Sequence, residues 1–210
     1  LWMLAIAVAF AVVFGKEVFG GTGMNILNVA LTARAFLFFA YPTFMSGDKI
    51  WVHEGLTNDA ISGATILGDL AGMKEGLASL RFTVEDMMFG FIPGSIGETS
   101  LIAILIGAAI LIITGIGSWR VMLSAVAGGA VMGLIFNAFS ANGLMEFPWY
   151  QHMMVGGFAF GVVFMATDPV TAAQTNAGKW IYGFLIGILA IMIRVFNPAY
   201  PEGIMLAILF

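Results

Sequence analysis

Apolar runs separated by polar links dominate the chain. They cover residues 1–14, 26–41, 101–116, 121–139, 153–165, 181–195 and 204–210. None alternates strictly between apolar and polar positions, as membrane β-strands do, so we interpret them as helices. A helix needs roughly 20 residues to cross the hydrocarbon core of a membrane, and several of these runs are shorter. The pattern predicts an all-α, polytopic membrane helical bundle with short or broken helices.

Glycine interrupts most of these runs, and the chain contains 27 glycines. A broken helix exposes N–H and C=O groups that lipid cannot satisfy, so breaks persist where they line a cavity or hold a ligand. Glycine also lets two helices pack closely. We favour close packing for Gly128, Gly129 and Gly133. It explains less about residues 20–23, Gly-Gly-Thr-Gly, which lie outside an apolar run.

The segment 42–100 is the polar part of the chain. It carries eight acidic and three basic residues, so its net charge is −5. No other segment is long enough to form structure outside the membrane. We therefore divide the chain into a first set of membrane helices (1–41), a polar loop (42–100) and a second set of membrane helices (101–210).

The composition supports a membrane environment. The chain is 60% apolar and 10% charged, whereas soluble domains are nearer half apolar and a quarter charged. Both ends lie inside apolar runs, so we expect a piece of a longer chain. The absence of cysteine excludes disulfides and cysteine-ligated iron–sulfur clusters within these residues. The net charge of −4 gives no reason to expect a nucleic-acid partner.

Charge also predicts an orientation in the membrane. If every run crosses, the polar loop and the links 142–151 and 197–203 lie on one side. The short connections on the other side carry Lys16, Arg120 and Lys179. Because basic short loops stay in the cytoplasm, we expect the acidic loop to be exported, which is periplasmic in a bacterial inner membrane.

The polar loop contains the sequence Asp59-Ala60-Ile61-Ser62-Gly63-Ala64-Thr65 before an apolar stretch. One interpretation is a helix start with Ser62 or Thr65 as the N-cap. Ser-Gly-Ala-Thr is also a motif on which a flavin transferase esterifies the phosphate of FMN to the threonine hydroxyl. A phosphodiester anion suits a helix N-terminus, where free N–H groups favour negative charge. Thr65 would then be the acceptor of a covalent FMN.

Several segments together resemble one family, the B subunits of bacterial sodium-translocating NADH:quinone oxidoreductases. The segments that carry the resemblance are 15–23, 34–42, 59–65, 165–170 and 197–203. The related D subunits of Rnf complexes share the flavin threonine and a similar Thr-Asp-Pro segment. The stretches 16–23 and 178–180 fit the quinone-reducing family better.

The resemblance implies a fold, a function and partners. The fold is a bundle like that of urea and ammonium transporters. Electrons from NADH would pass through covalent FMN on Thr65 and a bound riboflavin to quinone, and their energy would drive Na⁺ outward across the bacterial inner membrane. Asp59, Ser62, Gly63 and Ala64 would complete the attachment motif. The implied partners are the other subunits of the complex, the flavin transferase and the lipid bilayer.

A second candidate site lies between Gly21 and Asn28. Gly21 and Gly23 allow backbone conformations and a close ligand approach that other residues prevent. Asn25 and Asn28 share a face if a helix has already begun, and their carboxamides suit the edge of a flavin ring. A capped helix entry explains the pattern equally well. The resemblance implies that both asparagines hold riboflavin, although the family usually has proline where this chain has Val29.

A third candidate is Asp168, within Thr-Asp-Pro at the end of an apolar run. Such a residue can mark a functional site or simply a helix terminus, since proline favours an extended residue before it. The resemblance implies a role in Na⁺ uptake, and carboxylate oxygen suits this cation. It also places Phe36 and Phe38 near the quinone or ion path. Without the resemblance, both phenylalanines read as lipid-facing or packing residues.

Three further polar residues receive ordinary interpretations. Arg194, at the end of an apolar run, is predicted to extend its charged group to the membrane interface. His53 and His152 lie in or beside polar links and are predicted to be surface histidines.

Two alternative functions remain open from the sequence. A passive channel or transporter with the same bundle would also have broken helices and an aspartate, but it would not need the flavin motif. An Rnf-type subunit that serves ferredoxin:NAD⁺ exchange would share the motif. We predict the sodium-pumping quinone reductase subunit.

Overall fold

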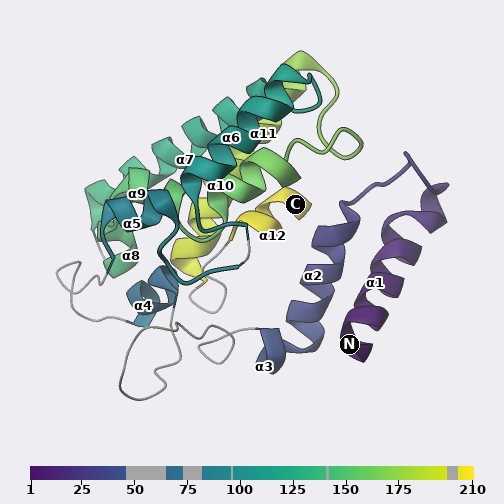
Figure 1. The fold of residues 1–210 in the computed structure, drawn as a ribbon, viewed down its shortest axis with the longest axis horizontal. Helices are drawn as coiled ribbons and strands as arrows, with labels where there is room; N and C mark the ends of the chain where they lie inside the picture. The colour runs from purple at the N-terminus through teal and green to yellow at the C-terminus, as the bar shows by residue number, and fades with distance from the viewer. Residues whose placement is uncertain (46–64, 73–81, 96, 141, 198–202) are drawn as a thin grey trace.

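A computed structural model describes residues 1–45, 65–72, 82–95, 97–140, 142–197 and 203–210. Every regular element in this part of the chain is helical. The prediction of an all-α fold is therefore confirmed. Figure 1 shows a helical hairpin near the N-terminus lying beside a larger body formed by the later helices.

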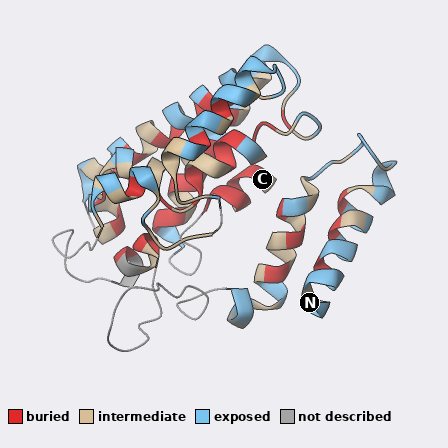
Figure 2. Cartoon of the chain, in the orientation of Figure 1, coloured by how far each residue is buried: buried red, intermediate tan, exposed pale blue. Residues whose placement is uncertain are grey.

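The hairpin consists of α1 (Trp2–Gly15) and α2 (Val29–Ala40), joined through the 3₁₀ turn η1 (Glu17–Phe19). Small and branched residues on the facing sides form a core of their own: Ala7, Ala11, Ala33 and Leu37. Most other residues of α1 are exposed (Figure 2), among them the large apolar residues Trp2, Leu4, Phe10 and Phe14. Such a surface suits lipid or neighbouring membrane helices, and it would not suit water.

Two long helices, α7 (Trp119–Phe139) and α11 (Asn176–Phe196), form the centre of the larger body. Aromatic pairs near the beginnings and near the ends of both helices show that the two helices run parallel. The ring centroids of Trp119 and Trp180 are 6.0 Å apart, and those of Phe136 and Phe196 are 5.6 Å apart. Near the start, the hydroxyl of Ser124 donates to the carbonyl oxygen of Lys179 at 3.3 Å. Arg120 and Lys179 thus lie at the same end, as the sequence predicts.

Glycine sets the separation of α7 and α11. A Cβ on Gly128 would overlap the Phe184 carbonyl, and one on Gly187 would overlap the Ala125 carbonyl. Gly129 and Gly133 make similar room for Phe158 and for the backbone of Trp149. The packing interpretation of the α7 glycines is confirmed.

The chain between α7 and α11 is a series of short helical pieces. They are α8 (Gly143–Glu146), α9 (Trp149–Met154), α10 (Phe158–Phe160) and the π-helical turn η3 (Gly161–Met165). Gly156 and Gly157 separate α9 from α10, and both have φ of +66°. Only glycine adopts this conformation at little cost, so the sequence itself specifies the break. The prediction of broken helices is confirmed here.

Among the residues that the structure describes, three helical stretches are long and apolar enough to cross a membrane. They are Trp2–Phe19, Trp119–Phe139 and Asn176–Phe196. The helices α2 and α6 (Leu101–Ile113) are apolar but shorter, and α12 (Ile204–Leu209) packs against α11. The chain is a multi-pass membrane protein in which full-length helices alternate with shorter ones.

The described part of 42–100 contains α3 (Pro42–Met45), α4 (Ile66–Gly72) and α5 (Val84–Phe89). Leu67, Leu70 and Met87 are buried in the same apolar core as α7 and α11. At the start of α5 the backbone N–H and the hydroxyl of Thr83 donate to the Asp86 carboxylate. These two bonds, the backbone one first, lower the pKa of Asp86 below its usual value. Through Leu67, Leu70 and Met87, the described parts of the polar segment pack against the membrane helices.

Gly187→Ala tests the close approach of α7 and α11. The added methyl group would meet the Ala125 carbonyl, and overpacking of this kind costs about 1–3 kcal/mol. We expect a lower unfolding temperature for the full-length subunit in detergent. Gly15→Ala is the matched control, because the nearest atom to its Cβ would be 3.8 Å away. Equal unfolding temperatures for the two variants would contradict the packing argument.

Candidate functional site

Thr65 immediately precedes α4 and caps it, as the sequence predicts for this residue or Ser62. Its hydroxyl oxygen accepts a hydrogen bond from the Gly68 N–H at 3.2 Å, and the side chain is half-buried. The other residues of the motif, Asp59, Ser62, Gly63 and Ala64, lie outside the described residues.

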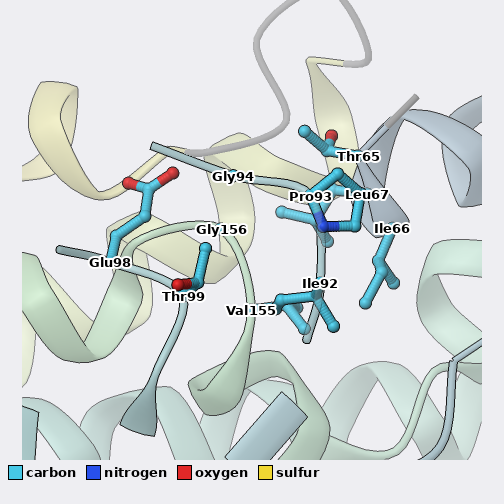
Figure 3. Close-up of a pocket in the computed structure, with 10 residues that line it drawn as sticks. All are labelled: Thr65, Ile66, Leu67, Ile92, Pro93, Gly94, Glu98, Thr99, Val155 and Gly156. Atoms are coloured by element: carbon cyan, nitrogen blue, oxygen red, sulfur yellow. The ribbon is translucent and has the colours of Figure 1, made fainter. Parts of the chain in front are cut away.

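A pocket lies beside Thr65. It contains about 380 Å³ of empty space, including space open to solvent. Figure 3 shows Thr65 beside Pro93 at one side of the pocket and Glu98 at the opposite side. The residues that line the pocket are Thr65, Ile66, Leu67, Ile92, Pro93, Gly94, Glu98, Thr99, Val155 and Gly156. Most are apolar, which is the usual character of a pocket that binds a flat organic group.

The helix break between α9 and α10 forms one wall of this pocket. A Cβ on Gly156 would overlap the Leu67 side chain, and a Cβ on Gly157 would lie 2.7 Å from the Glu98 carboxylate. The Glu98 carboxylate also accepts a hydrogen bond from the Ser95 N–H at 2.9 Å. Segments 65–67, 92–95, 98–99 and 155–157 therefore meet here, although they come from different parts of the sequence.

The predictions for Arg194 and His152 are wrong. Arg194 does not reach the membrane interface, and His152 is not a surface residue, since neither side chain has any exposed area. The Arg194 guanidinium donates to the carbonyl oxygens of His152 and Val155. The Nε2 atom of His152 lies 3.0 Å from the Leu144 carbonyl oxygen. The carbonyl groups left unpaired at a helix break inside a membrane protein need hydrogen-bond donors from the protein itself. The hydropathy of the surrounding sequence does not reveal this requirement. His53 lies outside the described residues.

At the second candidate site, α2 begins at Val29, with Asn28 as its N-cap. The Asn28 side-chain oxygen accepts hydrogen bonds from the N–H groups of Ala30 (3.1 Å) and Leu31 (3.2 Å). Asn25 precedes the helix, so the two asparagines do not share a helical face. Val29 occupies the first helical position, where proline is also favoured, so its presence leaves the cap intact.

Asn25 has an unusual environment for a polar residue. Its side-chain oxygen is buried and has no hydrogen-bond partner among the described residues. Gly21 and Gly23 precede it with φ of +88° and +89°, so the backbone there adopts a conformation that side chains disfavour. A buried acceptor without a donor is costly, and it is satisfied when a ligand supplies an N–H or O–H group.

Asp168 lies next to Asn28, 140 residues away in the sequence. The Asn28 amide nitrogen is 3.5 Å from one carboxylate oxygen, and that oxygen accepts a hydrogen bond from the Thr171 hydroxyl at 2.9 Å. The other oxygen accepts from the Val170 N–H at 3.2 Å. The structure thus joins the second and third candidate sites, which the sequence treats separately. No local signal links them.

Phe36 and Phe38 lie on different sides of α2. Phe36 packs toward α1, with its ring centroid 4.7 Å from that of Phe10, whereas Phe38 contacts Phe39 at 5.4 Å. The structure does not bring these two phenylalanines together at one site.

The Thr65 pocket and the contact between Asn28 and Asp168 lie at opposite ends of the stretch formed by α10 and η3. Val155 and Gly156, just before α10, line the pocket of Thr65. Asp168 follows η3 and contacts Asn28. The residues between them, 158–165, form α10 and the π-helical turn η3.

These features define a class: polytopic membrane proteins in which a broken helix separates two polar sites. The chain belongs to the NQR2, RnfD, RnfE family, whose model matches residues 1–210. The resemblance predicted from the sequence is therefore confirmed.

Curated relatives carry a more specific name. The chain is 54% identical over 212 residues to the B subunit of the Na(+)-translocating NADH-quinone reductase of Chromohalobacter salexigens, and the match covers all of this chain and 51% of that protein. It is 54% identical to the protein of the same name from Stutzerimonas stutzeri and 52% identical to that from Azotobacter vinelandii, again over the whole chain and 52% of each relative. The chain thus spans about half the length of these relatives.

Proposed function

We propose that this chain is part of the membrane subunit of a sodium-pumping NADH:quinone oxidoreductase. In this function electrons pass through a covalent FMN on Thr65 and a bound riboflavin to quinone, and Na⁺ is exported. The observation that carries the proposal is the pocket beside Thr65, in a chain whose relatives bear the name of this complex. The other subunits and a flavin transferase are the implied partners.

The surroundings of Thr65 suit a covalent flavin. The Thr65 hydroxyl oxygen accepts a hydrogen bond from the Gly68 N–H, so the hydroxyl proton takes no part in that bond. A phosphoryl group can therefore replace this proton while the hydrogen bond is kept. The neighbouring pocket is mainly apolar, which suits the ring system of a flavin. When bound, the flavin would supply the electron-carrying chemistry. This chain would position it and exclude water from one side.

Asn25 and Asn28 are our candidates for holding riboflavin. The buried acceptor of Asn25 can take a hydrogen bond from the ring N–H of a flavin. Gly21 and Gly23 leave space for a ligand to approach the backbone. Because Asn28 contacts Asp168, a flavin at this site would lie close to a carboxylate.

Asp168 is our candidate for Na⁺ uptake. Its carboxylate and the Thr171 hydroxyl are hard oxygen ligands, which suit an alkali cation. Both lie at the end that carries Arg120 and Lys179, which the positive-inside rule assigns to the cytoplasm. The Thr65 pocket would then face the periplasm. Phe36 and Phe38 remain candidates for the quinone or ion path.

The two alternative functions receive less support. A passive channel would not require the Thr65 motif, and its relatives would not carry the name of a redox enzyme. Rnf-type subunits belong to the same family, but the relatives described above are all named as quinone reductase subunits.

In-gel fluorescence after denaturing electrophoresis tests the covalent flavin. The full-length subunit is produced in a host that has the flavin transferase. We expect a fluorescent band for the wild type and complete loss of it for Thr65→Ala, because the acceptor oxygen is removed. Thr114→Ala, an exposed threonine at the end of α6, is the control and should keep the band. A dark wild-type band, or a fluorescent Thr65→Ala band, would refute the assignment.

Flavin extraction tests the second site. We expect Asn25→Ala to reduce the riboflavin that denaturant releases from the purified complex, because the buried acceptor is lost. Fluorescence of Thr65-bound flavin should be unchanged. Asn142→Ala is the control, since it removes an N-cap asparagine from α8 elsewhere in the chain. Full riboflavin content in Asn25→Ala would rule out this residue.

Sodium dependence of quinone reduction tests Asp168. Asp168→Asn keeps the size of the side chain and removes its charge. If the charge contributes about 1.4 kcal/mol to Na⁺ binding, half-maximal activity should need about tenfold more Na⁺. Glu17→Gln, at an exposed carboxylate near the end of α1, should leave the dependence unchanged. An unaltered Na⁺ dependence in Asp168→Asn would exclude it from the uptake path.

A further inference from the structure

A buried arginine donates hydrogen bonds to the backbone at the helix break near Thr65. Arg194 lies in the last turn of α11 and has no exposed surface. Its Nη2 atom donates to the Val155 carbonyl oxygen at 3.1 Å, and its Nη1 atom donates to the His152 carbonyl oxygen. A guanidinium presents several donors in a rigid plane, so it can bind two carbonyls of a broken helix at once.

The same contacts reach the pocket wall. Val155 and Gly156 both line the pocket, and a Cβ on Gly156 would lie 2.9 Å from Arg194 Nη2. The same Cβ would also overlap the side chain of Leu67, two residues after Thr65. Arg194 and Leu67 therefore meet on the same side of Gly156, and the three residues form one layer. The position of α4 relative to the wall depends on this layer of three residues.

We propose that Arg194 is a positioning residue for the flavin on Thr65. Its planar group fixes the backbone of Val155 and Gly156, and this wall fixes the surroundings of the flavin through Leu67. The inference rests on the function proposed above for Thr65. It concerns the geometry of the donor group, so a residue that retains only the positive charge should not replace it.

Arg194→Lys separates geometry from charge. Lysine keeps the charge but offers a flexible point donor in place of the planar fork. We expect the protein to keep its fluorescent band, while the absorption spectrum and the midpoint potential of the covalent flavin shift from the wild-type values. A wild-type spectrum and potential in Arg194→Lys would overturn the proposal.

Two controls separate this effect from general damage. Ile191→Val alters a fully buried residue of the same helix, and Arg120→Lys makes the same chemical change at the other end of the bundle. Both should leave the spectrum and potential of the covalent flavin unchanged. A matching shift in either control would overturn the specific role of Arg194. If Arg194→Lys does not assemble, Leu67→Ala interrupts the same layer and should shift both values, and wild-type values there would also overturn the proposal.

A thiol probe tests the wall without using the flavin. The chain has no cysteine, so Thr99→Cys places a single thiol of this chain in the pocket lining. We expect maleimide to label it faster when Arg194→Lys is added, and not faster when Ile191→Val is added. An unchanged labelling rate with Arg194→Lys would overturn the proposal. Because this readout is independent of flavin attachment, it distinguishes failure at Arg194 from failure of the Thr65 assignment.

Discussion

Backbone hydrogen bonding in an apolar environment is the constraint on which this structure depends. A continuous helix satisfies its own N–H and C=O groups, but a broken one cannot, and lipid offers no replacement partners. The chain breaks its helix between Met154 and Phe158, and a buried guanidinium supplies the missing donors at two carbonyls. The arginine thus makes an otherwise costly loop possible inside the protein.

The two long helices around this break, α7 and α11, pack closely because of their glycines. Glycines on α7 and α11 let the two backbones approach until main-chain atoms touch, so dispersion contacts replace the hydrophobic effect that lipid cannot provide. Closely packed helices hold the broken segment in a defined position. The wall of the Thr65 pocket is hydrogen-bonded to the end of α11 through Arg194, so the position of α11 determines the shape of the pocket.

Sequence patterns predicted the helices, the broken segment and the helix start at Thr65, because each depends on local composition. They did not predict the burial of Arg194 and His152, because a charged residue at the end of an apolar run usually reaches water. They also did not predict the contact between Asn28 and Asp168, which depends on how the hairpin docks onto the body. Tertiary contacts of this kind have no periodic signature. Residues 59–64 lie outside the described residues, so most of the flavin motif remains a sequence prediction.

The parallel arrangement of α7 and α11 has a topological consequence. Two adjacent helices that point the same way must be joined by a chain that returns across the full depth of the bundle. In this protein the connection runs from Phe139 to Asn176 and contains α8, α9, α10 and η3. The return path is therefore the interrupted segment itself, which places its non-helical residues between the two membrane faces. A polar pathway through the bundle therefore does not have to run between intact helices, because the fold already places a stretch of non-helical backbone in the interior of the bundle.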